Sequence, residues 1–305
     1  MLQQRGMRHW VAGALLALTP MLGQAATEVK HAQGSTQVPD KPAKTVVMDL
    51  AVLDTLHTLG VDVAGVPAAT AWSEHLAQFA DKRYVKVGSM FEPNYEAINQ
   101  LAPQVIFVAG RSAPKYGDLS RLAPTVDLTV DAKDLVGSVE RNARLVAAIY
   151  GREAQADDKI KQLKASIASV QERAAKAGTG LIILTTGGKM SAYGPGSRFG
   201  VLHDAFGVKA AAPDLKQSNH GQAVSFEFIS QLNPDWLFVI DRDAAIGREG
   251  SSARQLLDNE LMRSTKAWKN QHVVYLNAAN WYSLGAAGLT ALQQGADEVG
   301  AVLAK

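Results

Sequence analysis

Apolar and polar positions alternate in blocks along the first half of the chain, and each block has the length of one strand or one helix. Residues 45–50 and 61–66 are short apolar runs that predict buried strands. Leucines recur at helical spacing between residues 53 and 59, and the polar stretch 27–44 predicts a short edge hairpin. Strands that alternate with helices favour a parallel sheet covered by helices.

The middle of the chain has the pattern of two long helices. No proline occurs between residues 132 and 177, and an apolar stripe precedes Gly151. Residues 154–177 are rich in Ala, Lys, Gln and Glu, which are strong helix formers. Such a helix extends roughly 35 Å. We expect it to be a rigid connecting backbone between two α/β lobes; the alternative is an ordinary surface helix of one lobe.

Apolar runs and helical periodicity resume beyond these helices. Residues 181–184 and 273–276 predict strands, and residues 201–206 and 289–303 predict helices. A glycine-rich stretch, 187–200, follows the first of these strands. The pattern therefore indicates a second α/β lobe.

One segment occurs twice, once in each predicted lobe. Residues 94–111 read NYEAINQLAPQVIFVAGR and residues 225–242 read SFEFISQLNPDWLFVIDR, without a gap and at an offset of 131 residues. Eight of the eighteen positions are identical, and each copy predicts a helix, a proline break and a buried strand. The spacing is too long for a solenoid repeat and indicates two lobes of similar build.

The predicted fold class is α/β, with two Rossmann-like lobes that have central parallel sheets and are joined by a long rigid connecting helix. The chain has 305 residues, enough for two domains that each bury a core. We place a signal peptide at 1–25, an N-terminal lobe at 26–150, the connecting helix at 151–178 and a C-terminal lobe at 179–305.

The N-terminus predicts secretion, and the composition limits what the mature chain can bind. Arg5 and Arg8 precede an apolar run at 10–22 and then Gly23-Gln24-Ala25, the order of a signal peptide that is cleaved after Ala25. Cleavage leaves 29 basic and 29 acidic residues, so general binding of nucleic acid is not expected. The absence of cysteine excludes disulfides, thiolate metal sites and a lipid anchor. We expect a soluble, unanchored protein of the periplasm.

Three arginines are candidate ligand-binding residues. Arg111 and Arg242 end the two copies of the repeat, at strand ends where open α/β sheets bind ligands. Arg198 follows a Gly-Pro-Gly turn, which places it at a loop tip. Each guanidinium offers a planar fork of donors that suits oxygen-rich anions. We expect the three to form a cationic bowl; the alternative for Arg198 is a solvated loop side chain.

His220 and Tyr282 are candidate iron ligands. His220 lies in a polar loop before the second copy of the repeat, and Tyr282 lies in the loop 277–288. Together an imidazole and a phenol can complete an Fe(III) coordination sphere that a ligand leaves open. The alternatives are a surface histidine and an aromatic residue that caps the core.

Motifs for catalysis and for nucleotide binding are absent from the sequence. The glycines fit neither a P-loop nor a dinucleotide fingerprint. There is no thiol nucleophile, and neither Gly-x-Ser-x-Gly nor His-Glu-x-x-His occurs. We therefore do not expect an enzyme.

The exported two-lobe chain with the duplicated Glu-x-Ile-x-x-Leu-x-Pro segment resembles the periplasmic substrate-binding proteins of iron-complex ABC importers. The resemblance covers essentially the whole mature chain, and it is greatest to the binding proteins for ferric catecholate siderophores. It implies that Arg111, Arg198 and Arg242 neutralise a trianionic iron complex. It also implies that His220 and Tyr282 bind the iron when the siderophore supplies only four donors. No permanent cofactor is implied, because Fe(III) arrives as the siderophore complex.

The same resemblance implies a partner in the inner membrane. In this family a glutamate on each lobe docks to arginines of the ABC permease, and Glu96 and Glu227 occupy those positions; the alternative is simple capping of a helix N-terminus by acidic charge. A monomer is expected. The absent lipobox cysteine, present in many relatives, bears on anchoring and not on ligand. Heme or cobalamin binding on the same fold, and an exported hydrolase, are the alternative functions.

Overall fold

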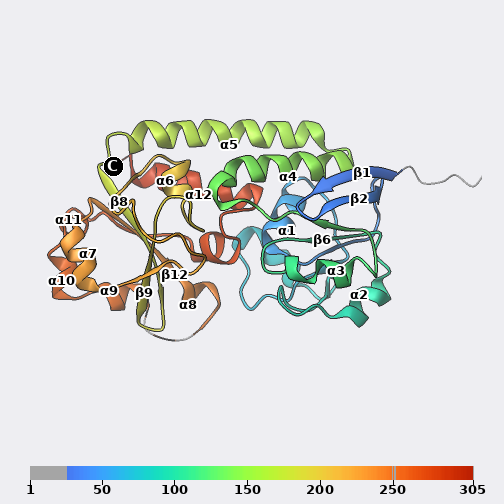
Figure 1. Ribbon diagram of the computed structural model, residues 1–305, viewed down its shortest axis with the longest axis horizontal. Coiled ribbons are helices and arrows are strands. Elements are labelled where there is room, and N and C mark those ends of the chain that lie inside the picture. The colour runs from blue at the N-terminus through green and yellow to red at the C-terminus, as the bar shows by residue number, and fades with distance from the viewer. Residues whose placement is uncertain (1–25, 249, 251, 305) are drawn as a thin grey trace, which may run out of the picture.

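The computed structural model describes residues 26–304 except 249 and 251. The predicted signal peptide, residues 1–25, lies outside the described residues. Two sheets lie at the two ends of an elongated molecule, and the long helix α5 (Glu153–Ala174) runs along one side of both (Figure 1). This arrangement confirms the predicted α/β fold with two lobes and a connecting helix.

The first sheet has five parallel strands in the order β5-β4-β3-β6-β7. The strands are β3 (Thr45–Val47), β4 (Gly65–Val66), β5 (Val85–Lys86), β6 (Val105–Val108) and β7 (Thr125–Asp127). The helical segments around it are α1 (Leu50–Thr58), η1 (Glu74–Ala80), α2 (Tyr95–Leu101), η2 (Ala113–Lys115), α3 (Tyr116–Leu119) and η3 (Ala132–Asp134). Strand order that steps outward from β3 in both directions is typical of doubly wound α/β folds.

Two predictions for this lobe need correction at their boundaries. The strand predicted at 45–50 ends at Val47, because the Asp49 side chain accepts hydrogen bonds from Ala51 N and Val52 N and so starts α1 early. The predicted hairpin forms from β1 (Ala26–His31) and β2 (Gly34–Pro39), but it is a separate two-stranded sheet and not an edge of the central one.

The second sheet has the order β11-β9-β8-β12-β13, with β10 beside β8. Its strands are β8 (Thr179–Thr186), β9 (Lys189–Tyr193), β10 (Lys209–Ala210), β11 (Gln222–Val224), β12 (Trp236–Asp241) and β13 (Val273–Tyr275). The pairs of β8, β10, β12 and β13 are parallel, whereas β9 and β11 are antiparallel to their neighbours. The short helices are α6 (Val201–Asp204), α7 (Phe226–Leu232), α8 (Arg242–Ala245), α9 (Ala253–Leu257), α10 (Glu260–Arg263) and α11 (Lys266–Lys269).

The glycine-rich stretch after β8 contains a strand that the sequence pattern did not predict. Gly187 and Gly188 have φ of 53° and 75°, and this pair of positive values suits a two-residue hairpin turn between β8 and β9. The two glycines therefore reverse the chain between β8 and β9.

The two copies of the repeat have the same local structure. Asn94 and Ser225 cap α2 and α7 through their side chains, and both helices have seven residues. Both helices end in a left-handed residue, Ala102 at φ 46° and Asn233 at φ 48°, before the proline and the strand. Sequence similarity here corresponds to matched backbone geometry in the two lobes.

A single hydrophobic cluster joins the lobes. It includes Val47 and Phe107 from the first sheet and Ile182 and Phe238 from the second. The helices α4 (Leu135–Tyr150), α5 and α12 (Leu289–Val302) contribute to the same cluster, and α12 packs along α5. This core does not divide at 150/151 or at 178/179. The lobe boundaries that we place there stay a prediction. Within the described residues, no helix has the length and apolar character that crossing a membrane requires.

Candidate ligand site between the lobes

The three candidate arginines reach one side chain, Tyr282. Arg111 lies in the loop after β6, Arg242 is the first residue of α8 directly after β12, and Arg198 lies in the loop after β9. The three guanidinium carbons lie 5.5, 5.4 and 4.8 Å from the centroid of the Tyr282 ring, in the order Arg111, Arg242, Arg198. These distances are within the range of cation–π contact. The predicted convergence of the arginines is therefore present, with Tyr282 at its centre.

Hydrogen bonds fix this cluster. Arg242 donates from Nε to the Tyr282 hydroxyl (2.6 Å), and Arg198 donates from Nη2 to the Tyr282 carbonyl (2.6 Å). Arg111, from the N-terminal lobe, donates to the carbonyls of Tyr282 (3.2 Å) and Ser283 (3.1 Å). The Arg111 contacts connect the two lobes across the site.

The electrostatics of the cluster favour negative charge. Burial alone would raise the pKa of the Tyr282 phenol, but the hydrogen bond from Arg242 and the charges of the three arginines outweigh burial and lower that pKa. Burial and the neighbouring charge of Arg111 lower the pKa of Arg198. Burial raises the pKa of the Asp49 carboxyl, although the charge of Arg111 acts on it in the opposite direction. The site can therefore stabilise an anion with oxygen donors, and it promotes ionisation of its own phenol.

The segment that carries Tyr282 is held by side chains on α12. It forms a short π-helical turn, Ala279–Ser283, a geometry that recurs at functional sites. The buried Trp281 donates its indole N–H to Glu298 Oε2 (3.0 Å), and Asn280 donates to Gln294 Oε1 (2.6 Å). These two anchors hold the residues directly before Tyr282 against α12, and Tyr282 itself faces the arginines.

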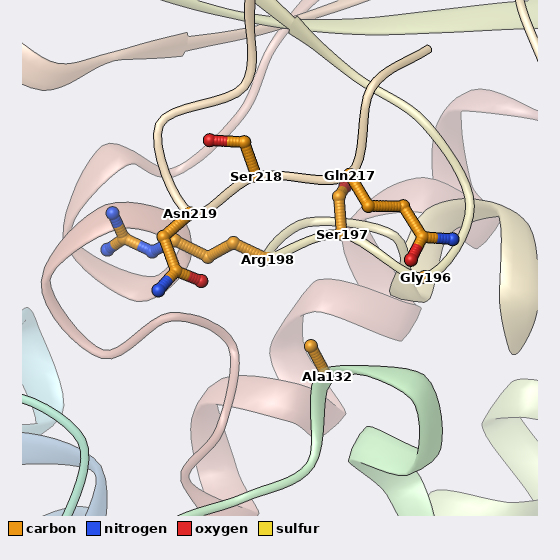
Figure 2. Close-up of a pocket in the computed structure, with 7 residues that line it drawn as sticks. All are labelled: Ala132, Gly196, Ser197, Arg198, Gln217, Ser218 and Asn219. Carbon is orange, nitrogen blue, oxygen red and sulfur yellow. The ribbon is translucent and has the colours of Figure 1, made fainter. Parts of the chain in front are cut away.

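A pocket of about 320 Å³ lies beside Arg198 (Figure 2). Figure 2 shows the loop 217–219 on one side and Ala132, from the N-terminal lobe, on the other. The lining residues are Ala132, Gly196, Ser197, Arg198, Gln217, Ser218 and Asn219. Apart from Arg198 the lining is neutral and largely polar, so it offers hydrogen bonds without further charge.

The structure does not bring His220 into the arginine cluster. His220 follows the pocket loop and is exposed, and the contact recorded for it is from its backbone N–H to Ser218 Oγ (3.1 Å). Among the described residues, no three histidine or acidic side chains are placed to hold a metal ion. Iron ligation by His220 and Tyr282 stays a prediction.

Glu96 and Glu227 occupy the second position of matching helices, one on each lobe, and both are exposed. Glu96 accepts a hydrogen bond from Gln100 (3.2 Å), and the pKa of Glu227 is lowered by a hydrogen bond from the Ser225 side chain. The Glu227 contact is compatible with helix capping, the Glu96 contact is an i, i+4 pair along α2, and both carboxylates are exposed.

Two residues at the site were not among the sequence candidates. Thr186, the last residue of β8, accepts a hydrogen bond from Arg242 Nη1 (3.0 Å), and Met90 places its sulfur 3.9 Å from Arg111 Nη1. Thr186 has a usable signal, since it is the polar end of an apolar strand at the ligand edge of a sheet. Met90 has none, because a loop methionine gives no periodic or motif signal.

Comparison with known proteins agrees with this geometry. The model of a family described as periplasmic binding protein matches residues 46–279. The chain is 42% identical over 276 residues to the petrobactin-binding protein YclQ of Bacillus subtilis, which covers 89% of this chain and 86% of that protein. It is 31% identical over 284 residues to the ferric-anguibactin-binding protein FatB of Vibrio anguillarum, covering 89% and 85%.

Solved structures show the same similarity in three dimensions. The crystal structure of YclQ from Bacillus subtilis superposes with a TM-score of 0.88 at 40% identity, covering 92% of this chain and 99% of that chain. The periplasmic catecholate-siderophore binding protein VctP of Vibrio cholerae gives 0.86 at 29% identity, covering 91% and 100%. The relatives are binding proteins and not enzymes, as expected from the sequence.

Proposed function

Because this chain belongs to the family of periplasmic binding proteins, we propose that it captures a ferric siderophore of the catecholate type between its lobes and delivers it to an ABC permease. The observation that carries the proposal is the convergence of Arg111, Arg198 and Arg242 on the single side chain of Tyr282. The relatives named above bind petrobactin, anguibactin and catecholate siderophores. The names of these relatives disfavour the alternative functions, which are binding of heme or cobalamin and activity as a hydrolase.

Charge complementarity supports the catecholate assignment. A ferric complex of six catecholate oxygens carries three negative charges, and three guanidinium groups supply three positive ones. Each guanidinium offers paired N–H donors that match oxygen atoms held on a metal. In the free protein these donors are bound to carbonyl and hydroxyl oxygens of Tyr282 and Ser283. Siderophore oxygens take over equivalent bonds in the complex.

Tyr282 and His220 have a further part in binding when the siderophore supplies only four donors. The phenol of Tyr282 is close to all three arginines and has a lowered pKa, which favours the phenolate that Fe(III) prefers. His220 is exposed at the edge of the Arg198 pocket, one residue after Asn219. The imidazole makes no contact with the arginine cluster in the free protein, so its loop would have to move for His220 to reach the iron.

The place of action and the partner belong to the same proposal. We place the mature protein in the periplasm, as a monomer without a lipid anchor, with the signal peptide at 1–25 removed. Glu96 and Glu227 are exposed on matched helices of the two lobes, so a permease that presents two basic sites can engage both.

Ligand titration of the wild-type protein tests the proposal. Trp281 is buried and directly precedes Tyr282, so tryptophan fluorescence reports occupation of the site. We expect ferric tetradentate and hexadentate catecholates to quench this signal saturably at low concentration, and heme and cobalamin to leave it unchanged. Saturable binding of heme alone would contradict the catecholate assignment. Steady turnover of a chromogenic ester would instead favour a hydrolase.

A further inference from the structure

A fully buried carboxylate on the N-terminal lobe has no part in the arginine cluster. Asp54 is in α1, has no exposed surface, and lies against the beginning of α12. An ionisable side chain in such a position is costly unless its hydrogen-bonding capacity is satisfied. Both Asp54 oxygens do have partners: Oδ2 accepts from Ala291 N (2.9 Å), and Oδ1 from His75 Nε2 (3.0 Å).

The partner of Asp54 Oδ2 is the first turn of the C-terminal helix. Gly288 is the N-cap residue of α12 and has no side chain to satisfy the free N–H groups, and the first turn has no acidic residue. Asp54 supplies the missing acceptor and negative charge from the other lobe. A Cβ at position 288 would collide with the Asp54 carboxylate, so glycine is needed there for the close approach.

Two threonines of α1 reinforce the same contact. Thr55 Oγ1 accepts a hydrogen bond from Leu289 N (3.3 Å), and Thr58 Oγ1 lies 2.6 Å from Thr290 Oγ1. Thr58 also donates to Asp54 Oδ1 (3.3 Å). The N-terminal lobe therefore caps α12 with Asp54 and Thr55, and Thr58 on the same face of α1 adds a side-chain contact to Thr290.

The segment that carries Tyr282 leads directly into α12, which begins after Gly288. That segment is tied to α12 through Trp281–Glu298 and Asn280–Gln294, and its carbonyls receive the guanidinium of Arg111. A path that combines hydrogen bonds to α12 with the covalent backbone of α12 and of residues 280–282 thus leads from Asp54 to Tyr282 and on to Arg111. Its two ends, Asp54 and Arg111, are both on the N-terminal lobe.

We propose that Asp54 is a positioning residue for the ligand site: by capping α12 from the opposite lobe, it places the Tyr282 segment against Arg111. The consequence for iron chelates rests on the proposed function, but the placement itself does not. Loss of this cap frees the first turn of α12 and the adjoining residues 279–288. Tyr282 then samples positions in which its phenol and carbonyls no longer meet the arginines.

Hydrogen exchange of the ligand-free protein tests the placement. In Asp54→Asn a single amide oxygen must replace two carboxylate oxygens with different partners. We expect amides in 279–291 to exchange roughly fivefold faster, as for loss of a helix cap, with strands β3 and β6 unchanged. Asp235→Asn is the matched control, since Asp235 accepts from Thr179 N (2.8 Å) at the sheet edge away from the arginines. Unchanged exchange in 279–291, or equal acceleration everywhere, would overturn the proposal.

A milder variant and a ligand arm complete the test. If Asp54→Asn does not fold, Thr58→Val removes the contacts to Thr290 and Asp54, and we expect the same local pattern at smaller size. For iron chelates, Asp54→Asn should weaken the ferric tetradentate catecholate more than the hexadentate one, which is also the pattern that we expect for Tyr282→Phe. If amides in 279–291 exchange faster in Asp54→Asn but the wild-type protein binds no chelate, the positioning role is supported and the siderophore function is contradicted.

Discussion

Tyr282 supplies both a backbone carbonyl and a phenol to arginines from three separate segments of the chain. Guanidinium groups repel one another, and the pKa of Arg198 is lowered partly for that reason. The oxygens of Tyr282 offset this repulsion while no anion is present. The free site is consequently organised around Tyr282, and in the proposed complex siderophore oxygens would compete with it for the same donors.

Neutral replacement of the arginines tests this organisation. A hydrogen bond to a charged group contributes about 1.5–3 kcal/mol, and tenfold in Kd corresponds to about 1.4 kcal/mol. We therefore expect Arg111→Gln and Arg242→Gln each to weaken the ferric hexadentate catecholate by roughly 10- to 100-fold. The measurement is fluorescence titration at two salt concentrations. Arg263 on α10 pairs with Asp258 away from the ligand site, so Arg263→Gln is the control and should bind like wild type.

At the level of residues, the sequence predicted most of the cluster because its members follow recognisable strand ends and turns. Arg111, Arg198 and Arg242 lie around Tyr282, a position of the phenol that the sequence did not predict, and the ligand-binding roles of all four stay predictions. His220 remains an exposed loop residue outside the cluster. The Asp54 contact has no sequence signal, because it depends on how α1 and α12 pack and the two are more than 200 residues apart.

Elements with strong local signals matched the sequence prediction best. Residues 95–101 and 105–108 have the predicted helix and strand, since a capping side chain starts the helix and a proline follows its end. The strands β9 and β11 were missed, because β9 lies in a glycine-rich stretch and β11 pairs with it antiparallel at the sheet edge. The pairing of β11 with β9 joins segments that are separated in the chain, and local propensity does not encode it.

One element carries a pH-sensitive contribution to stability. His203 in α6 is half-buried, and its Nδ1 bonds to the Val208 carbonyl (2.8 Å); this partial burial is the main reason why its pKa lies below the usual value. The folded state therefore binds this proton less readily than the unfolded state. The His203 contribution is present above pH 6.5 and is lost as pH falls through the lowered pKa.

We expect the free energy of unfolding to decrease between pH 7 and pH 5, with at most about 1.4 kcal/mol per pH unit from this single proton. His203→Gln retains a donor for the Val208 carbonyl and should flatten that decrease. Urea denaturation at the two pH values measures the effect. His220→Gln, at an exposed position, serves as the comparison and should follow wild type. An unchanged slope in His203→Gln would rule out His203 as its source.

At the scale of the whole molecule, a continuous hydrophobic cluster and the helices α5 and α12 hold the two lobes together. Relative motion of the lobes must disturb this core, so closure on a ligand is expected to be small. The sequence predicted the two lobes and the connecting helix, but it did not predict that α12 would be capped from the opposite lobe. A permease can then recognise a nearly rigid pair of surfaces.

Charge reversal at the matched glutamates tests the docking proposal. Because Glu96 and Glu227 are exposed and contact no arginine of the ligand site, Glu96→Lys and Glu227→Lys should leave siderophore affinity unchanged. We expect both to reduce stimulation of the ATPase of the reconstituted permease, and the double variant to abolish it. Glu153→Lys, in the first turn of α5, is the control for added charge. Full stimulation by the double variant would exclude the docking role.

The proposed siderophore site is tested most directly by the affinity of Tyr282→Phe for two ferric catecholates that differ only in the number of donors. The phenol hydroxyl receives Arg242 and is the proposed iron ligand, and its removal leaves the ring and the backbone carbonyl in place. We expect Tyr282→Phe to lose at least tenfold more affinity for the tetradentate complex than for the hexadentate complex, a difference in binding free energy of about 1.4 kcal/mol. Equal affinities of Tyr282→Phe and wild type for the tetradentate complex would contradict this expectation.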